Sequence, residues 1–163
     1  MDENIEKYLR MLKKQRVAAI GRAADMLWII FEDTNAACSA RTISLHVQSS
    51  WRITNTEKKS IIVASLDMYF PKSSEEYTDD FEWDIQGNNL FDEKSANWLE
   101  NAGDIFIDEV QMDLWGDLRL SFSNGDQMEV FVDVSDETEC WRIFRKDDLN
   151  LRHMVMTGEG VYF

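Results

Sequence analysis

Apolar residues near the N-terminus are spaced three or four positions apart, which places them on one face of an α-helix. They are Ile5, Tyr8, Leu9 and Leu12. Acidic side chains come early in this segment and basic side chains late, an order that suits the helix dipole. The pattern therefore predicts an amphipathic helix over residues 3–16.

A second and shorter helix is expected in the middle of the chain, over residues 93–101. Asp92 is a suitable N-cap, because its carboxylate can accept a hydrogen bond from the first turn. Trp98 and Leu99 would face inward. Gly103 would adopt the left-handed conformation that commonly ends a helix.

Most of the remaining chain shows apolar runs or strict alternation, and both patterns predict β-strands. The expected strands cover residues 26–31, 43–53, 61–70, 105–112, 117–122, 127–134, 140–145 and 151–157. The run 26–31 is almost wholly apolar, which favours a central strand covered on both faces, with Gly21 as a bend before it. Ser49 and Ser50 would form a bulge, and Pro71 would end the third strand.

An Asn-Gly pair at 124–125 marks a hairpin between two of these strands. A two-residue loop would place Leu120 opposite Glu129, which mixes apolar and acidic side chains on one face. A three-residue loop over 124–126 places Leu120 opposite Val130 and keeps that face apolar. The longer loop, or a bulge, is therefore predicted.

The tripeptide Trp-Arg-Ile occurs twice, at 51–53 and 141–143, each time after a segment that predicts a hairpin. This repetition indicates two related halves, over about residues 17–70 and 105–157. The whole pattern predicts a single α+β domain over residues 1–163. Its N-terminal helix and short mid-chain helix would pack on a mostly antiparallel, two-part β-sheet.

Each Trp-Arg-Ile unit divides its side chains between the two faces of a strand. Trp51 and Trp141 are expected in the core. Arg52 and Arg142 would lie on the opposite face, where they can pair with carboxylates. The alternative is that these two arginines bind an anionic ligand.

Several segments together resemble an uncharacterised family of small bacterial proteins with a doubled Trp-Arg-Ile. The segments are GRAADMLWIIF (21–31), SLHVQSSWRI (44–53), IIVASLDMYFP (61–71), FEWDIQGN (81–88) and EVFVDVSDETECWRIF (129–144). Proteins of this kind resemble immunity proteins, antitoxin-like inhibitors encoded beside polymorphic toxins. The resemblance implies a non-catalytic inhibitor that binds a toxin tightly.

The chain of 163 residues carries 31 Asp and Glu against 17 Lys and Arg, a net charge of −14. Such a charge repels nucleic acid and anionic lipid, and it accelerates encounter with a basic partner. The sequence shows neither the ~18-residue apolar run of a membrane span nor the apolar core of a secretory signal. We therefore expect a cytoplasmic protein with a basic protein partner, without direct contact with nucleic acid or membrane.

The acidic side chains are concentrated in two places, which are the expected partner-binding residues. The first is Glu75, Glu76, Asp79, Asp80, Phe81, Glu82, Trp83 and Asp84, and the second is Asp136, Glu137 and Glu139, with Asp133 nearby. Phe81 and Trp83 would offer aromatic anchors between steering charges. For residues 79–84, a solvated loop ranks first, an interaction surface second and a metal site third.

The sequence contains no recognisable catalytic, cofactor or metal site. His46 and His153 stand in no metal-binding or catalytic pattern, and 79–84 lacks the spacing of an EF-hand. Cys38 and Cys140 are far apart in the sequence and are expected to be free thiols. Without a P-loop or a dinucleotide motif, no cofactor is expected.

Two other classes of function stay open beside the binding protein. One is a structural or assembly subunit of a bacterial complex, which would use exposed strand edges or an apolar patch. The other is an enzyme of unrecognised type. That hypothesis requires His, Cys and acidic side chains to converge in one pocket.

Overall fold

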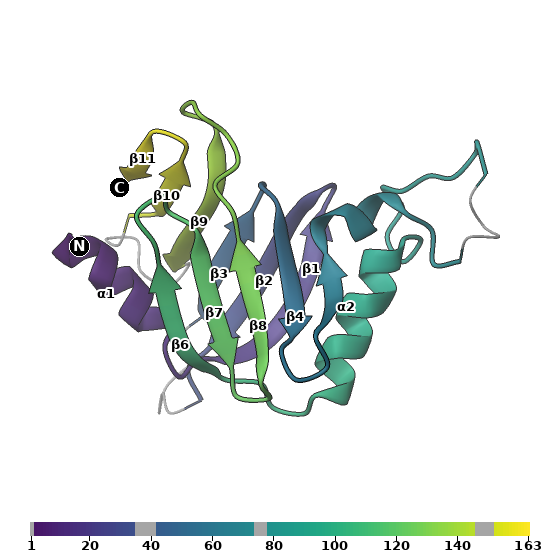
Figure 1. The fold of residues 1–163 in the computed structure, drawn as a ribbon, viewed down its shortest axis with the longest axis horizontal. Helices are drawn as coiled ribbons and strands as arrows, with labels where there is room; N and C mark the ends of the chain where they lie inside the picture. Colours follow the sequence, from purple (N-terminus) through teal and green to yellow (C-terminus); the bar gives the residue numbers. More distant parts are fainter. Residues whose placement is uncertain (1, 35–41, 74–77, 146–151) are drawn as a thin grey trace.

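Two antiparallel β-sheets lie face to face, and a helix closes each open side of the stack (Figure 1). The computed structural model describes residues 2–34, 42–73, 78–145 and 152–163. The α+β class and both predicted helices are confirmed.

The helices are α1 (Glu3–Leu12) and α2 (Leu90–Asn101), with a 3₁₀ helix η1 (Ser65–Tyr69). One sheet has six strands, in the order β1 (Arg16–Ala23), β2 (Met26–Glu32), β3 (Thr42–Val47), β9 (Glu139–Arg145), β10 (Met154–Thr157) and β11 (Gly160–Tyr162). The other has five, in the order β5 (Ser60–Ala64), β4 (Trp51–Asn55), β8 (Asp126–Val130), β7 (Leu118–Phe122) and β6 (Ile107–Met112).

The two halves of the chain follow the same order of elements. Each has a helix, then three strands of one sheet, then strands of the other sheet (Figure 1). β3 of the first half pairs with β9 of the second, and β4 pairs with β8. Each helix packs on the first strand of the opposite half, α1 on β6 and α2 on β1. Origin by duplication stays a prediction.

Apolar side chains from both sheets and both helices form one buried cluster. Trp51 and Trp141 lie in it, and both are almost fully buried. Each is placed there by the alternation of its strand, which turns the following arginine outward, although Cys140, directly before Trp141, is also buried. The core therefore includes the tryptophan of each Trp-Arg-Ile unit.

The N-terminal helix is shorter than its pattern predicted. It ends at Leu12, because the chain then turns to pair with the start of the second half. The N–H of Lys14 donates to the carbonyl of Ile107 at 2.8 Å, and the N–H of Val17 donates to Ile105 at 2.8 Å. These hydrogen bonds replace the ones that would have continued the helix to residue 16.

The apolar run 26–31 forms β2, but the strand is neither central nor covered on both faces. It lies second from the edge of its sheet, and its residues alternate between buried and half-buried. Gly21 lies inside β1 rather than at a bend. A Cβ on Gly21 would come within 2.3 Å of the Trp28 ring, so the glycine permits a close approach.

Ser49 and Ser50 mark a crossing between the sheets and not a bulge within one strand, because β3 and β4 belong to different sheets. The alternation continues across them because both sheets turn a face to the same core. The strand expected over 61–70 ends at Ala64. Its N–H donates to the Asp67 carboxylate at 2.9 Å, and this bond begins η1.

The hairpin between β7 and β8 has the predicted three-residue loop, shifted by one residue. Leu120 lies opposite Met128, which leaves 123–125 as the loop and keeps the paired face apolar. The shift draws Asp126 into β8, where its buried carboxylate accepts a 2.9 Å hydrogen bond from the Trp98 indole. That bond joins the hairpin to α2.

The mid-chain helix α2 begins at Leu90, earlier than predicted, because Asn89 and not Asp92 is its N-cap. The Asn89 side-chain oxygen accepts a hydrogen bond from the N–H of Asp92 at 3.0 Å. The C-terminal end of α2 is as predicted, because Gly103 has a φ of 65°, in the left-handed region. The sequence pattern did not predict β11.

Candidate protein-binding edge

The acidic loop is held against the sandwich by a buried arginine. Arg22 has a side chain with no exposed area, and its guanidinium donates two hydrogen bonds of 2.9 Å to the Asp92 carboxylate. It also donates to the carbonyls of Asp84 at 3.4 Å and Ile85 at 2.8 Å. Burial would raise the pKa of Asp92, but the hydrogen bonds from Arg22 and the N–H of Gly87 outweigh it and lower that pKa. An ionised pair therefore fixes the loop to α2.

Aromatic rings hold the middle of this loop. Trp83 packs against Tyr69 of η1, with ring centroids 4.9 Å apart, and its carbonyl accepts from the Asn89 side chain at 2.9 Å. Tyr69 donates its hydroxyl proton to the Asp25 carboxylate at 2.9 Å. Burial, followed by the hydrogen bond to Asp25, raises the pKa of Tyr69. Trp83 therefore supports the loop as well as lining its surface.

Large apolar side chains are exposed on η1, directly after it, and at the end of the acidic loop. Leu66 and Phe70 are 66% and 48% exposed, and Ile85 is 50% exposed. The exposed acidic residues of the described loop are Asp79, Asp80, Glu82 and Asp84. Apolar side chains grouped beside charged ones are typical of protein–protein interfaces.

The second acidic cluster lies at the same end of the molecule. The Asp133 carboxylate accepts hydrogen bonds from the N–H and the hydroxyl of Ser50, at 3.0 and 2.6 Å. Asp133, Asp25 and Tyr69 line one shallow cavity of about 190 Å³. Because Tyr69 also packs on Trp83, this cavity lies between the acidic loop and Asp133.

Figure 1 shows η1, the crossing between β3 and β4, and the loop between β8 and β9 at one end of the sandwich. We call this surface the acidic edge, and it comprises residues 25, 48–50, 65–70, 78–85 and 133–137.

The structure divides the residues predicted to bind a partner. Those exposed on the acidic edge are Asp79, Asp80, Glu82, Asp84, Asp136 and Glu137. Phe81 and Trp83 are half-buried. Glu139 is half-buried and bonded to Arg142, so it does not belong to the exposed set. Glu75 and Glu76 lie outside the described residues.

Sequence reasoning missed the apolar part of this edge. The run 61–70 predicted a buried strand, whereas Leu66 and Phe70 lie beyond the end of β5 and are exposed. Ile85 carried no signal other than its position after the aromatic and acidic residues. The only indication in the sequence was that the apolar residues continue beyond residue 64, where β5 ends.

The arginines of the two Trp-Arg-Ile units pair with carboxylates, as the first of the two predicted interpretations required. Arg52 Nε donates to Glu129 at 2.7 Å, and Arg119 donates to the same carboxylate at 3.2 Å. Arg142 pairs with Glu139 through two donors. Burial would raise the pKa of Glu129, but the hydrogen bonds and charges of the two arginines lower it.

Both histidines lie against Phe144 on the outer face of the six-stranded sheet. The ring centroids of His46 and His153 are 4.8 and 4.4 Å from that of Phe144.

Cys140 is buried, and burial raises the pKa of its thiol. Cys38 lies outside the described residues. Within the described ranges, no three His, Cys, Asp or Glu side chains are grouped to hold a metal ion.

Comparison of the chain with protein-family models, curated proteins and solved structures finds no match. In the part of the chain that the structure describes, no helix is both long and apolar enough to cross a membrane. The resemblance to immunity proteins therefore stays a prediction from the sequence.

Proposed function

We propose that this protein is a non-catalytic binding domain of the cytoplasm that recognises a basic protein through the acidic edge. Inhibition of a toxin, as by an immunity protein, is the specific role we favour. The observation that carries the proposal is the exposure of two apolar side chains near carboxylates: Leu66 of η1, which lines a cavity with Asp25 and Asp133, and Ile85 of the anchored loop.

The anchoring supports a binding role on energetic grounds. A loop held by Arg22 and by the packing of Trp83 on Tyr69 loses little conformational entropy when a partner binds. The apolar side chains would supply contact energy, since a few buried anchors dominate most interfaces. The carboxylates would speed association and select a basic partner.

The binding test requires the partner in pure form. Wild-type protein captures it from the native host, mass spectrometry identifies it, and calorimetry measures the affinity. We expect Leu66→Ala combined with Ile85→Ala to weaken binding roughly thirtyfold, the loss typical of a hot spot. Glu82→Lys with Asp84→Lys should weaken binding and reduce its dependence on salt.

A matched charge reversal separates a local effect from net charge. Glu57→Lys with Glu100→Lys changes the charge equally at exposed positions outside the acidic edge. We expect it to leave the affinity within about twofold, because exposed charges more than about 10 Å apart are screened. Equal losses from the two reversals would contradict the assignment of the site.

The inhibitory role is tested separately by growth. Expression of the identified partner alone should arrest a host that lacks both proteins, and co-expression of this protein should restore growth. Leu66→Ala with Ile85→Ala should restore it less well. A partner that is harmless when expressed alone would contradict the toxin-inhibitor role.

A further inference from the structure

The turn between β6 and β7, residues 113–117, holds the two most exposed large apolar side chains that the structure describes. Leu114 is 98% exposed and Trp115 is 80% exposed. We call this turn the tip. A turn could be formed without large apolar residues, so their full exposure needs an explanation other than folding.

Hydrogen bonds fix the conformation of the tip. Asp113 Oδ1 accepts from the N–H of Trp115 at 2.8 Å and from the N–H of Asp117 at 3.0 Å. The carbonyl of Gly116 accepts from the Trp141 indole at 3.0 Å. The tip is therefore tied to the core, and Trp115 is presented on a rigid support.

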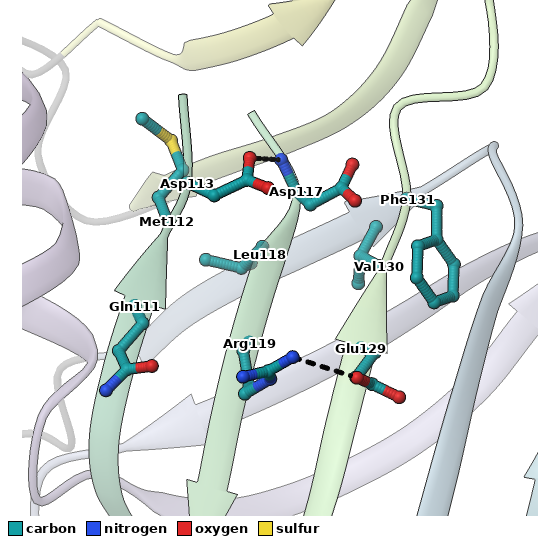
Figure 2. A pocket seen from close by; sticks show the side chains of 9 residues that line it. All are labelled: Gln111, Met112, Asp113, Asp117, Leu118, Arg119, Glu129, Val130 and Phe131. Carbon is teal, nitrogen blue, oxygen red and sulfur yellow. Dashed lines mark hydrogen bonds and ion pairs between the residues drawn. The ribbon is translucent and has the colours of Figure 1, made fainter. Parts of the chain in front are cut away.

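A cavity of about 380 Å³ opens beside the tip on the outer face of β6, β7 and β8 (Figure 2). Figure 2 shows Asp113 and Asp117 at the end nearest the tip and Phe131 at one side. Met112 and Phe131 are half-buried and add apolar surface to its lining, whereas the Leu118 and Val130 side chains are buried in the core below it. The cavity thus combines an acidic end with the apolar side chains of Met112 and Phe131.

The charge in this cavity is negative. Glu129 is already paired with Arg52 and Arg119. Asp113 and Asp117 each use Oδ1 to accept backbone N–H groups, and neither Oδ2 has a hydrogen-bond partner among the described residues. Two carboxylate oxygens therefore remain available to a cationic group.

We propose that this cavity takes an arginine or lysine side chain of the protein partner, with Leu114 and Trp115 packing on the apolar surface around it. Charge complementarity selects the occupant, since the available polar groups are carboxylate oxygens. The inference rests on the proposed function in requiring a basic protein partner.

The position of the cavity fits one extended interface. The tip lies at the same end of the sandwich as the acidic edge (Figure 1). Asp117 Oδ1 accepts from the N–H of Val132 at 2.7 Å, next to Asp133 of the acidic edge. One partner would then contact apolar anchors on both sides of a band of carboxylates.

The cavity is tested with N-acetyl-arginine methylamide as the probe, titrated into ¹⁵N-labelled protein and followed by NMR. We expect shifts of the Trp115 indole N–H and of the Arg119 backbone N–H. The uncharged citrulline counterpart should bind roughly fivefold more weakly, the factor of an exposed ion pair. Equal binding of the two probes would overturn the proposal.

The variant Asp113→Asn with Asp117→Asn keeps the oxygens that accept the backbone N–H groups and removes both charges. It should reduce arginine binding to the citrulline level. The matched control, Glu82→Gln with Asp84→Asn, should leave arginine binding unchanged. Shifts confined to residues 78–85 would show that the probe binds elsewhere and would sink the assignment.

A second copy of this chain is the rival occupant. A monomer–dimer equilibrium that Trp115→Ala abolishes, measured by analytical ultracentrifugation, would overturn the proposal. With the captured partner, Trp115→Ala should weaken binding at least tenfold, as loss of a buried aromatic anchor does. If Leu66→Ala with Ile85→Ala does not change partner affinity while the arginine probe still binds, the assignment of the acidic edge is contradicted and the assignment of the cavity is retained.

Discussion

Arg22 and Asp92 form a buried ion pair with two hydrogen bonds of 2.9 Å, although 70 positions separate them in the sequence. Arg22 belongs to β1 and Asp92 to the first turn of α2. The same guanidinium holds the carbonyl of Ile85. One side chain thus joins a strand, a helix and the loop 78–85 of the acidic edge.

Replacement of Arg22 by methionine should lower the free energy of unfolding by about 3–5 kcal/mol, because it leaves the largely buried Asp92 carboxylate with the Gly87 N–H but without its charged partner. Urea denaturation measures this loss. Arg10→Met is the control, since its ion pair with Glu6 is 72% and 50% exposed. It should cost less than about 0.5 kcal/mol, and a similar loss in both variants would contradict the role of Arg22.

Trp98→Phe tests the bond that sets the position of the β7–β8 loop. A smaller aromatic ring replaces the buried indole, and the buried Asp126 carboxylate loses the 2.9 Å donation from the indole N–H. We expect a loss of about 1–3 kcal/mol in unfolding free energy. Trp115→Phe, at an exposed indole, should be nearly neutral, and an equal loss in the two variants would contradict the role of the buried hydrogen bond.

Gly116→Ala should destabilise the protein more than Gly103→Ala. Both glycines have positive φ, 92° and 65°, where a Cβ costs about 1–2 kcal/mol. At Gly116 the Cβ would also lie 2.5 Å from the sulfur of Met156, whereas nothing lies within 4 Å at Gly103. Crowding should add about 1–3 kcal/mol. Equal melting temperatures for the two variants would show that Met156 moves aside freely.

His153 should make the protein less stable below neutral pH. Burial lowers the pKa of its ring, and Arg142, whose guanidinium lies 3.4 Å from Nδ1, lowers it further, while Glu139 opposes the shift. The unfolded chain, with the ordinary value of 6.5, takes up the proton first. This contribution is therefore present above pH 6.5 and lost as pH falls below it towards the folded-state pKa.

His153→Gln removes the titrating group and should flatten the dependence of unfolding free energy on pH from about 7.5 to 5.5. Urea denaturation at the two ends of that range measures the difference from wild type. An identical pH slope in the variant would contradict a lowered pKa.

Local pattern determined much of the fold. The apolar spacing of residues 5–12 predicted a helix, and alternation predicted most strands. The division of Trp141 and Arg142 between core and surface followed from alternation alone. Alternation along β7 and β8 also required an apolar residue opposite Leu120, although that residue is Met128 rather than Val130. The sequence also located the exposed carboxylates of 79–84.

Only the tertiary structure decided which segments meet. Alternation is the same whether β4 extends the sheet of β3 or crosses to the other, so Ser50 gave no sign of the crossing. The apolar run 61–70 could not show that Leu66 is exposed. The pairing of Arg22 with Asp92 depends on contacts between distant segments, and no local period records them. Local pattern reports which face of a strand is apolar, whereas packing between elements decides what that face meets.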